Sequence, residues 1–235
     1  MCIIVYNIGR LNLVINNKLI KYYLKNVLFI NGTAYAGKST MVKMLAEKYD
    51  LLHCGENYDC VPEGIFSPKE YQNIFYTKLM KDWQEFVNRT PDDYNRWIVE
   101  CSKEYEEFEI TYLIHMSQSK KTIVDTNISL ETLKKIADYN QVVIMLSPQS
   151  MSVDNFFSRD DSDKKFLKEQ IMKANDPEKT MNNFIECMAK INSQENYEKW
   201  ANSGFFTIVR NDTIKDTKLE TLEIIERHFS LRKGI

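Results

Sequence analysis

A lysine and a serine that follow two spaced glycines are the residues of this chain best suited to chemistry. Gly32 is followed after four residues by Gly37, Lys38 and Ser39, within the stretch FINGTAYAGKST at 29–40. Glycine lets the backbone turn its N–H groups toward an anion, because no Cβ stands in the way. A lysine reaches phosphate oxygens, and a serine hydroxyl can bind Mg²⁺. The chemistry that this combination suits is the binding of phosphate.

The elements on either side of these residues fit the same chemistry. Residues 27–30 form an apolar run that predicts a strand, and apolar residues within 41–49 recur at helical spacing. Between a strand and a helix, the pattern G-x-x-x-x-G-K-[ST] is a P-loop, which binds nucleotide phosphates. The N-terminus of the helix adds its partial positive charge. A tight strand-to-helix turn would explain the glycines, but not Lys38 and Ser39.

Composition argues against several other classes of protein. The chain has 235 residues, 43% of them hydrophobic, which fits a single α/β domain over residues 1–235. Its net charge of −2 gives no electrostatic basis for binding nucleic acid or an anionic membrane. We find no apolar run near the ~20 residues of a membrane span and no convincing signal peptide. Five scattered cysteines favour reduced thiols and a cytoplasmic location, whereas the oligomeric state is not indicated.

Predicted strands and helices alternate along the rest of the chain. Further strands are predicted at 50–54, 121–129, 141–147 and 205–212. This alternation predicts an α/β fold with a mainly parallel sheet of about five strands and helices on both faces. Ligands of such sheets bind at the carboxyl ends of the strands.

Helices are predicted from capping residues and from apolar spacing. A helical stretch opens at Ser67-Pro68, and Thr90-Pro91 is a favourable start for a long helix. Another helix is predicted at 130–139. The closing helix is expected to present one apolar face, formed by Leu219, Leu222, Ile225 and Phe229.

Two segments extend this core pattern. Residues 1–26 are an N-terminal extension or an edge element, for which a strand pair, a short helix and a poorly ordered segment all remain open. Because the predicted nucleotide elements begin at Val27, we expect deletion of the first 25 residues to leave nucleotide binding within a few-fold. Residues 148–200 form a long, charged helical insertion.

The chain lacks the motifs of several other nucleotide-binding classes. D-x-x-G and [NT]-K-x-D of GTPases and L-S-G-G-Q of transport ATPases are missing, and Asp125 is followed by Thr126 rather than by the glutamate common in motor-type ATPases. What remains resembles the small P-loop kinases that phosphorylate metabolites, such as shikimate, gluconate, adenylylsulfate and chloramphenicol kinases. The resemblance spans residues 27–230 in the order of elements, with GTAYAGKST as its specific motif. It implies a three-layer P-loop NTPase fold with a helical lid at 148–200.

The resemblance also implies roles for individual residues of the loop. Lys38 would serve both binding and catalysis, and Ser39 and Asp125 would hold Mg²⁺. Asp125 stands at the end of a predicted strand, where it could alternatively be a simple helix cap. The residues implied to bind the nucleotide in and around the loop are Gly32, Ala34, Tyr35, Ala36, Gly37, Lys38, Ser39 and Thr40.

Three further roles are carried over from these kinases. A carboxylate after the second strand accepts the proton of the substrate hydroxyl, and Glu56 and Asp59 both qualify, with Glu56 the first choice. Arg159, the sole arginine of the insertion, corresponds to the lid arginine that stabilises the transferring phosphoryl group. Its alternatives are Lys164, Lys165 and Lys168. Arg210, after the last strand, occupies the place of a residue that contacts adenine.

The implied activity is Mg²⁺-dependent transfer of the γ-phosphate of ATP to a hydroxyl, or a phosphate, of a small metabolite. The acceptor is expected between the 55–64 loop and the helices of 68–119, and the sequence does not identify it. The second hypothesis is an ATP-dependent regulatory switch or ATPase that has no metabolite acceptor.

Overall fold

The computed structural model describes residues 16–55, 64, 66–154, 156–157, 162–210 and 216–232. Over this part of the chain five strands pair in the order β2-β3-β1-β4-β5, and every pair is parallel. The strands are β1 (Val27–Gly32), β2 (Leu52–Cys54), β3 (Thr122–Asp125), β4 (Val142–Leu146) and β5 (Phe206–Val209). The predicted α/β fold is therefore confirmed, with a sheet that is wholly rather than mainly parallel.

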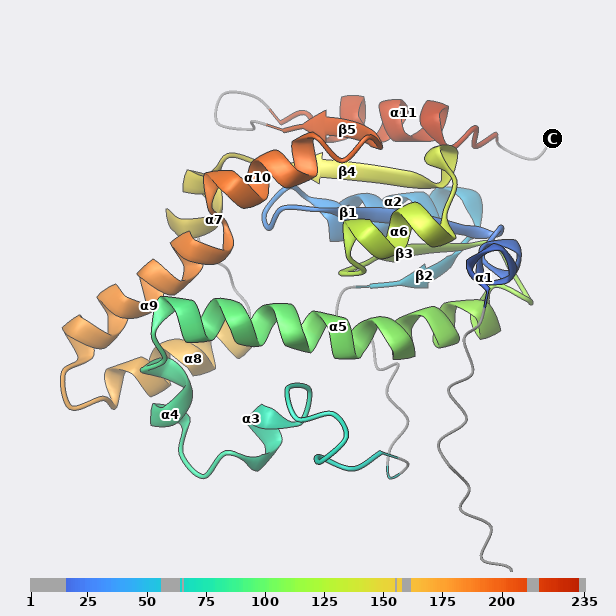
Figure 1. Cartoon of the computed structure of the whole chain (residues 1–235). Coiled ribbons are helices and arrows are strands. Elements are labelled where there is room, and N and C mark those ends of the chain that lie inside the picture. The colour runs from blue at the N-terminus through green and yellow to red at the C-terminus, as the bar shows by residue number, and fades with distance from the viewer. Residues whose placement is uncertain are drawn as a thin grey trace, which may run out of the picture.

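Helices cover both faces of this sheet (Figure 1). They are α1 (Asn17–Tyr23), α2 (Lys38–Tyr49), α3 (Tyr76–Leu79), α4 (Trp83–Val87), α5 (Pro91–Met116), α6 (Leu130–Ile136), α7 (Gln149–Asp154), α8 (Ser162–Met172), α9 (Pro177–Ile191), α10 (Gln194–Ala201) and α11 (Lys218–His228), with a 3₁₀ turn, η1 (Tyr139–Gln141). Side chains of α1, α5, α6 and α10 pack on one face, and those of α2 and α11 pack on the other. The fold thus has the three layers of a doubly covered parallel sheet.

The central strand β1 is buried on both faces of the sheet, which explains its run of apolar residues. Successive side chains of a strand point to opposite faces. Val27 and Phe29 accordingly lie in the core beneath α5 and α6, whereas Leu28 and Ile30 lie in the core beneath α2 and α11. A strand that is buried on both faces is expected to be apolar throughout, as 27–30 is.

The long helix α5 begins where its sequence predicted. The Thr90 hydroxyl accepts a hydrogen bond from the backbone N–H of Asp93, and Pro91 occupies the first helical turn. The helix stretch expected from Ser67-Pro68 is shorter than predicted, since residues 66–75 form turns and only α3 and α4 are helical. The carboxylate of Glu104 in α5 holds these turns, because it accepts hydrogen bonds from the backbone N–H groups of Asn73 and Ile74 at 3.0 and 2.9 Å.

A third apolar core lies away from the sheet, at the amino-terminal end of α5. It joins α4 and the start of α5 to α8 and α9, and we call these four segments the helical body. Its buried residues are Phe86, Val87, Tyr94, Ile171, Phe184, Cys187 and Met188. Figure 1 shows α4, α8 and α9 gathered around this end of α5. Helices α8 and α9 of the 148–200 insertion are therefore packed on helices that precede β3.

The N-terminal segment includes one described helix, α1. Residues 1–15 lie outside the described part of the chain, so of the three alternatives for 1–26 only the helix is seen, over Asn17–Tyr23. Leu24, directly after α1, is fully buried in the core beneath α5 and α6. Among all described residues, no helix is both long and apolar enough to cross a membrane.

Candidate functional site

The loop between β1 and α2 uses its two glycines for different reasons. Gly32 ends β1 at a φ of +129°, and a Cβ there would lie 1.9 Å from the carbonyl oxygen of Met145 in β4. Gly37 caps α2 at a φ of +86°. Both backbone conformations strongly favour glycine. Close packing on β4 therefore explains the glycine at position 32, and a left-handed turn explains the glycine at position 37.

The start of the loop is fastened to the end of β4. The backbone N–H of Thr33 donates to the carbonyl of Met145 at 3.0 Å, and the backbone N–H of Ser147 donates to the Thr33 hydroxyl at 2.8 Å. The Ser147 hydroxyl donates to the carbonyl of Ala34 at 2.7 Å. These bonds fix the residues that precede the first turn of α2.

A buried asparagine ties the same loop to the other neighbour of β1. Asn31 is 1% exposed, and its side-chain amide donates to the carbonyl of Ile128, beyond β3, at 2.7 Å. Its side-chain oxygen accepts from the backbone N–H of Gly32 at 2.7 Å. The loop is thus held from both sides, and a site built on it is preorganised.

Lys38, Ser39 and Asp125 converge at the carboxyl ends of β1 and β3. The Ser39 hydroxyl donates to Oδ2 of Asp125 at 2.6 Å, although the two residues are 86 positions apart. Nζ of Lys38 lies 3.9 Å from the other carboxylate oxygen, and it donates to the carbonyl of Thr33 at 3.3 Å. The convergence follows from the sheet register, in which Asp125 pairs with Ile30 one residue before Asn31.

These groups suit a bound magnesium ion. Mg²⁺ prefers oxygen ligands and usually takes only one or two from the protein, with water and phosphate completing the shell. The Ser39 hydroxyl and the Asp125 carboxylate are two such oxygens, held next to one another. Elsewhere among the described residues, no three His, Cys, Asp or Glu side chains gather as a metal centre.

A cavity of about 340 Å³ opens over the loop. Its floor consists of Ala34, Tyr35, Gly37, Lys38, Ser39 and Thr40. Its walls come from the insertion between β4 and β5, and they are Phe156, Lys164, Met188, Ile191 and Asn192. Nζ of Lys164 lies 5.3 Å from the ring centroids of both Tyr35 and Phe156. The cavity therefore combines a polar floor and one lysine of the insertion with an apolar wall.

Some predicted site residues lie outside the described part of the chain. These are Glu56, Asp59 and Arg159, whose roles remain predictions. Of the lysines considered as alternatives to Arg159, Lys164 lines the cavity. Arg210 directly follows β5, and its guanidinium lies against the loop, with Nη1 donating to the carbonyl of Ala36 at 3.2 Å.

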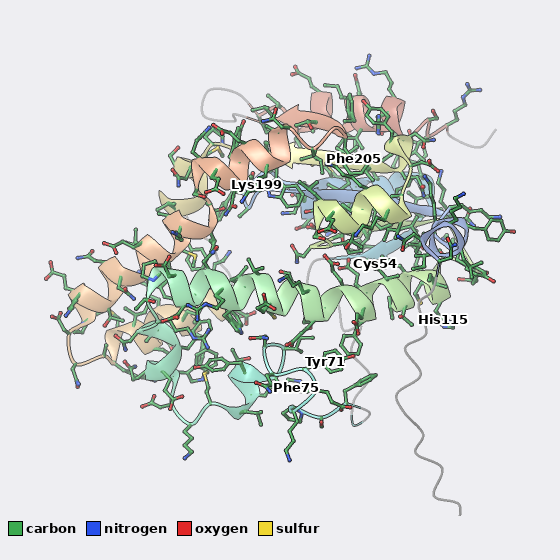
Figure 2. All side chains as sticks on the ribbon, in the orientation of Figure 1. Cys54, Tyr71, Phe75, His115, Lys199 and Phe205 are labelled. Atoms are coloured by element: carbon green, nitrogen blue, oxygen red, sulfur yellow. The ribbon has the colours of Figure 1, made fainter. Side chains whose placement is uncertain are left out.

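Sequence reasoning missed one buried carboxylate near the carboxyl end of β2. Glu109 in α5 is 5% exposed. It lies near Cys54, the last residue of β2, whose pKa is raised mainly by burial and further by the negative charge of Glu109. Figure 2 shows Cys54 on the side of α5 that faces the sheet. The signal in the sequence was that Glu109 stands four residues, about one helical turn, before the apolar Leu113. The structure buries Leu113 fully against the sheet. A charged residue on the buried stripe of a helix is a reason to consider a functional role.

The described cysteines are not activated nucleophiles. Burial raises the pKa of the Cys54, Cys101 and Cys187 thiols to about 11 in each case. A thiol with such a pKa is almost entirely protonated at neutral pH, and the thiolate is the reactive form. None of these three described thiols is therefore indicated as a nucleophile.

A larger cavity belongs to a different region of the molecule. It measures about 680 Å³ and is lined mainly by Glu and Lys side chains of α5 and by residues 66 and 69–71. Figure 2 shows Tyr71, one of its residues, on the side of α5 away from the sheet. The smaller cavity over the loop is the one that brings together the groups suited to phosphate.

We compared the chain with known proteins in three ways. A scan against protein-family models, a search of curated proteins and a search of solved structures each found no match. The residues and geometry of the site itself are therefore the basis for a function.

Proposed function

We propose that this chain is an ATP- and Mg²⁺-dependent phosphotransferase that acts on a small metabolite. It would transfer the γ-phosphate of ATP to a hydroxyl, or a phosphate, of that acceptor. The site is the cavity over the loop between β1 and α2, and the proposal extends the resemblance of GTAYAGKST to the P-loops of small kinases.

The observation that carries the proposal is the contact between Ser39 and Asp125. A P-loop needs its Ser or Thr hydroxyl beside a carboxylate from a neighbouring strand, so that a magnesium ion can bridge protein and phosphates. The 2.6 Å hydrogen bond joins these two groups, with the Lys38 ammonium 3.9 Å from the same carboxylate. A glycine turn that served only the fold would not require all three groups at one point.

Each residue has a distinct role under this proposal. Lys38 and the backbone N–H groups of the loop bind the β- and γ-phosphates, and Ser39 and Asp125 hold the magnesium ion. An ion held there would neutralise phosphate charge during transfer. Phosphoryl transfer depends mainly on positioning and charge neutralisation, so this set of groups is sufficient for the nucleotide side of the reaction.

The insertion between β4 and β5 supplies the other side of the cavity. Lys164 is directed to the same space as the loop and can neutralise a phosphate oxygen there, in addition to the role proposed for Arg159. Phe156, Met188 and Ile191 give this side an apolar character, which suits a flat or aliphatic part of a ligand.

The general base is proposed to be Glu56 or Asp59, in the loop after β2. Glu109 is a further candidate, because it is a buried carboxylate near the end of the same strand. We also propose a cytoplasmic location, for which the free thiols of Cys54, Cys101 and Cys187 are the supporting observation.

The first test is binding of MgATP to the wild-type chain and to Lys38→Met. Loss of a charge-assisted contact to phosphate is expected to weaken binding by about ten- to a hundredfold. Lys43→Met is the matched control, since Lys43 lies on the exposed side of the same helix. A wild-type chain that does not bind MgATP, or equal affinities for Lys38→Met and Lys43→Met, would show the proposal to be wrong.

The second test distinguishes a kinase from a regulatory switch. The chain is incubated with Mg²⁺, a metabolite extract and ATP that is labelled in its γ-phosphate. A kinase transfers the label to one compound, whereas a switch releases labelled phosphate slowly and labels none. Only the first result agrees with the proposed phosphotransferase.

A further inference from the structure

Arg210 reaches the loop from the far edge of the sheet. Its backbone N–H donates to the carbonyl of Leu146 at 2.7 Å, so the residue continues the pairing of β5 with β4. Its side chain is directed back toward the loop, and the residue is 7% exposed. Nη1 donates to the carbonyl of Ala36 at 3.2 Å, and Nε donates to the Thr217 hydroxyl at 3.4 Å. A buried guanidinium is thus bonded directly to the backbone of the loop.

This bond determines which way one peptide group of the loop faces. In a trans peptide the C=O of one residue and the N–H of the next point in opposite directions, and no described peptide is cis. Because the Ala36 carbonyl points to Arg210, the Gly37 N–H points away from Arg210. Gly37 also lines the cavity over the loop. From that side of the peptide, the N–H could donate to an anion in the cavity.

The same guanidinium explains why residue 37 has no side chain. A Cβ on Gly37 would lie 2.1 Å from Nη1 and 3.3 Å from Cζ of Arg210. Its φ of +86° disfavours a side chain as well. Arg210 and Gly37 are thus a complementary pair, in which the guanidinium occupies the space that a side chain would need.

We propose that Arg210 is a positioning residue for the phosphate groups of the nucleotide. It holds the Ala36–Gly37 peptide with its N–H directed into the cavity, and its positive charge lies directly behind the loop. The inference rests on the proposed function, and it gives Arg210 a role distinct from the adenine contact that its position after the last strand predicted. A positioning residue of this kind acts on the phosphates and is indifferent to the base.

The test compares two probes, MgATP and Mg-tripolyphosphate, which has the phosphates but no base. Arg210→Ala is expected to weaken binding of both probes by about ten- to a hundredfold, because a charge-assisted bond to the loop is lost. Arg210→Lys keeps the charge but not the planar guanidinium, so an intermediate loss is expected. Methylguanidinium added to Arg210→Ala is expected to restore part of the affinity for both probes. Arg227→Ala, which removes an exposed arginine of α11, is the control and should leave both affinities unchanged.

The binding results distinguish a failure of the proposed function from a failure of the inference about Arg210. A wild-type chain that binds neither probe would overturn the proposed function, and the inference with it. If the wild-type chain binds both probes and Arg210→Ala binds them equally well, the inference alone is overturned. Weaker binding of MgATP with unchanged binding of tripolyphosphate would also overturn it, in favour of a base contact. If Arg210→Ala does not fold, Arg210→Gln replaces it, with about a tenfold loss expected for both probes and unchanged affinities overturning the inference.

A double-mutant cycle tests the packing of Arg210 on Gly37. Gly37→Ala is expected to lower the affinity for tripolyphosphate more in the wild-type background than in Arg210→Ala, where the space beside residue 37 has been vacated. Equal losses in the two backgrounds would show that the guanidinium does not constrain this position.

Discussion

Ser39 and Asp125 are the residues on which the proposed magnesium site depends, and their short hydrogen bond makes each of them testable. Asp125→Asn removes a negative charge but keeps the size of the side chain, so the ion loses its strongest protein partner. We expect the Mg²⁺ concentration needed for half-maximal ATP binding to rise by about ten- to a hundredfold. The measurement is nucleotide affinity across a series of Mg²⁺ concentrations.

Asp50→Asn provides the control for this substitution. The Asp50 side chain is 93% exposed, and its φ of +53° is one that asparagine tolerates well. An equal Mg²⁺ requirement in Asp50→Asn and Asp125→Asn would contradict the assignment of Asp125 to the metal.

At the scale of residues, the sequence predicted local groups better than distant ones. Gly32, Lys38 and Ser39 form a pattern within one segment, and their types are the basis of the proposed phosphate binding. The bond between Arg210 and Ala36 joins residues 174 positions apart, and it exists because β5 and β1 flank the same strand. No periodicity or spacing encodes such a contact, so the predicted position of Arg210 could not reveal its partner.

Among the elements, the segment of α1 and the residues directly after it contributes more to the core than the sequence suggested. Leu24 is fully buried, and the Gln141 side-chain amide donates to the carbonyls of Leu24 and Val27 at 2.9 Å each. We expect Leu24→Ala to lower the free energy of unfolding by about 2–5 kcal/mol. Deletion of the first 25 residues, which we expected to be tolerated, would remove this side chain together with α1.

Leu19→Ala is the matched control for Leu24→Ala. Leu19 belongs to α1 but is 49% exposed, so its truncation should change the free energy of unfolding by less than about 0.5 kcal/mol. Urea denaturation of both variants measures the difference. Similar losses in the two variants would contradict the buried role of Leu24.

The elements also show where local signals are reliable. The start of α5 was predicted because Thr90 and Pro91 act within one helical turn, as the structure confirms. The turns at 66–75 were taken for helix, because their apolar spacing is helical while their backbone is held by Glu104 from α5. In α11, Leu222, Ile225 and Phe229 are buried as expected, but Leu219 in its first turn is 68% exposed. A periodic pattern predicts a face, and packing decides how far along the helix that face is covered.

For the whole molecule, the helical body is a separate contributor to stability. Phe184 is fully buried in it, at ring-centroid distances of 5.6 Å from Tyr94 and 5.9 Å from Phe156. Phe184→Ala is expected to lower the free energy of unfolding by about 3–5 kcal/mol. The neighbouring Ile185 is 39% exposed, and Ile185→Ala should have a much smaller effect. Thermal and urea unfolding of the two variants measure these losses of stability. Equal losses would contradict the packing of Phe184.

One histidine couples the stability of the molecule to pH. His228, at the end of α11, stacks on Phe206 of β5 at 4.3 Å, and its Nε2 lies 3.1 Å from the carbonyl oxygens of Tyr139 and Val142. Burial lowers the pKa of His228 below its usual 6.5, and the two carbonyls offset this only in part. The unfolded chain therefore binds this proton more readily than the folded chain.

The sign of the pH effect follows from this difference. The contribution of His228 to stability is present above a pH of about 6.5 and is lost as the pH falls from there through the lower pKa of the folded state. His228→Gln cannot titrate, so we expect its free energy of unfolding to fall less than that of the wild-type chain between about pH 7 and 5.5. Denaturation of both proteins over this range measures the difference. A constant difference at every pH would contradict a titrating role for His228.

The helical body also has a consequence for the chain during its synthesis. Tyr94 precedes its partner Phe184 by about 90 residues, and a ribosome that adds about 5–20 residues per second needs about 5–20 s to cover that interval. During this time the aromatic side chains of α4 and the start of α5 have been synthesised, whereas their partners on α8 and α9 are not yet complete. We expect the nascent chain to depend on chaperones during this interval, and slower translation to lengthen its exposure to aggregation.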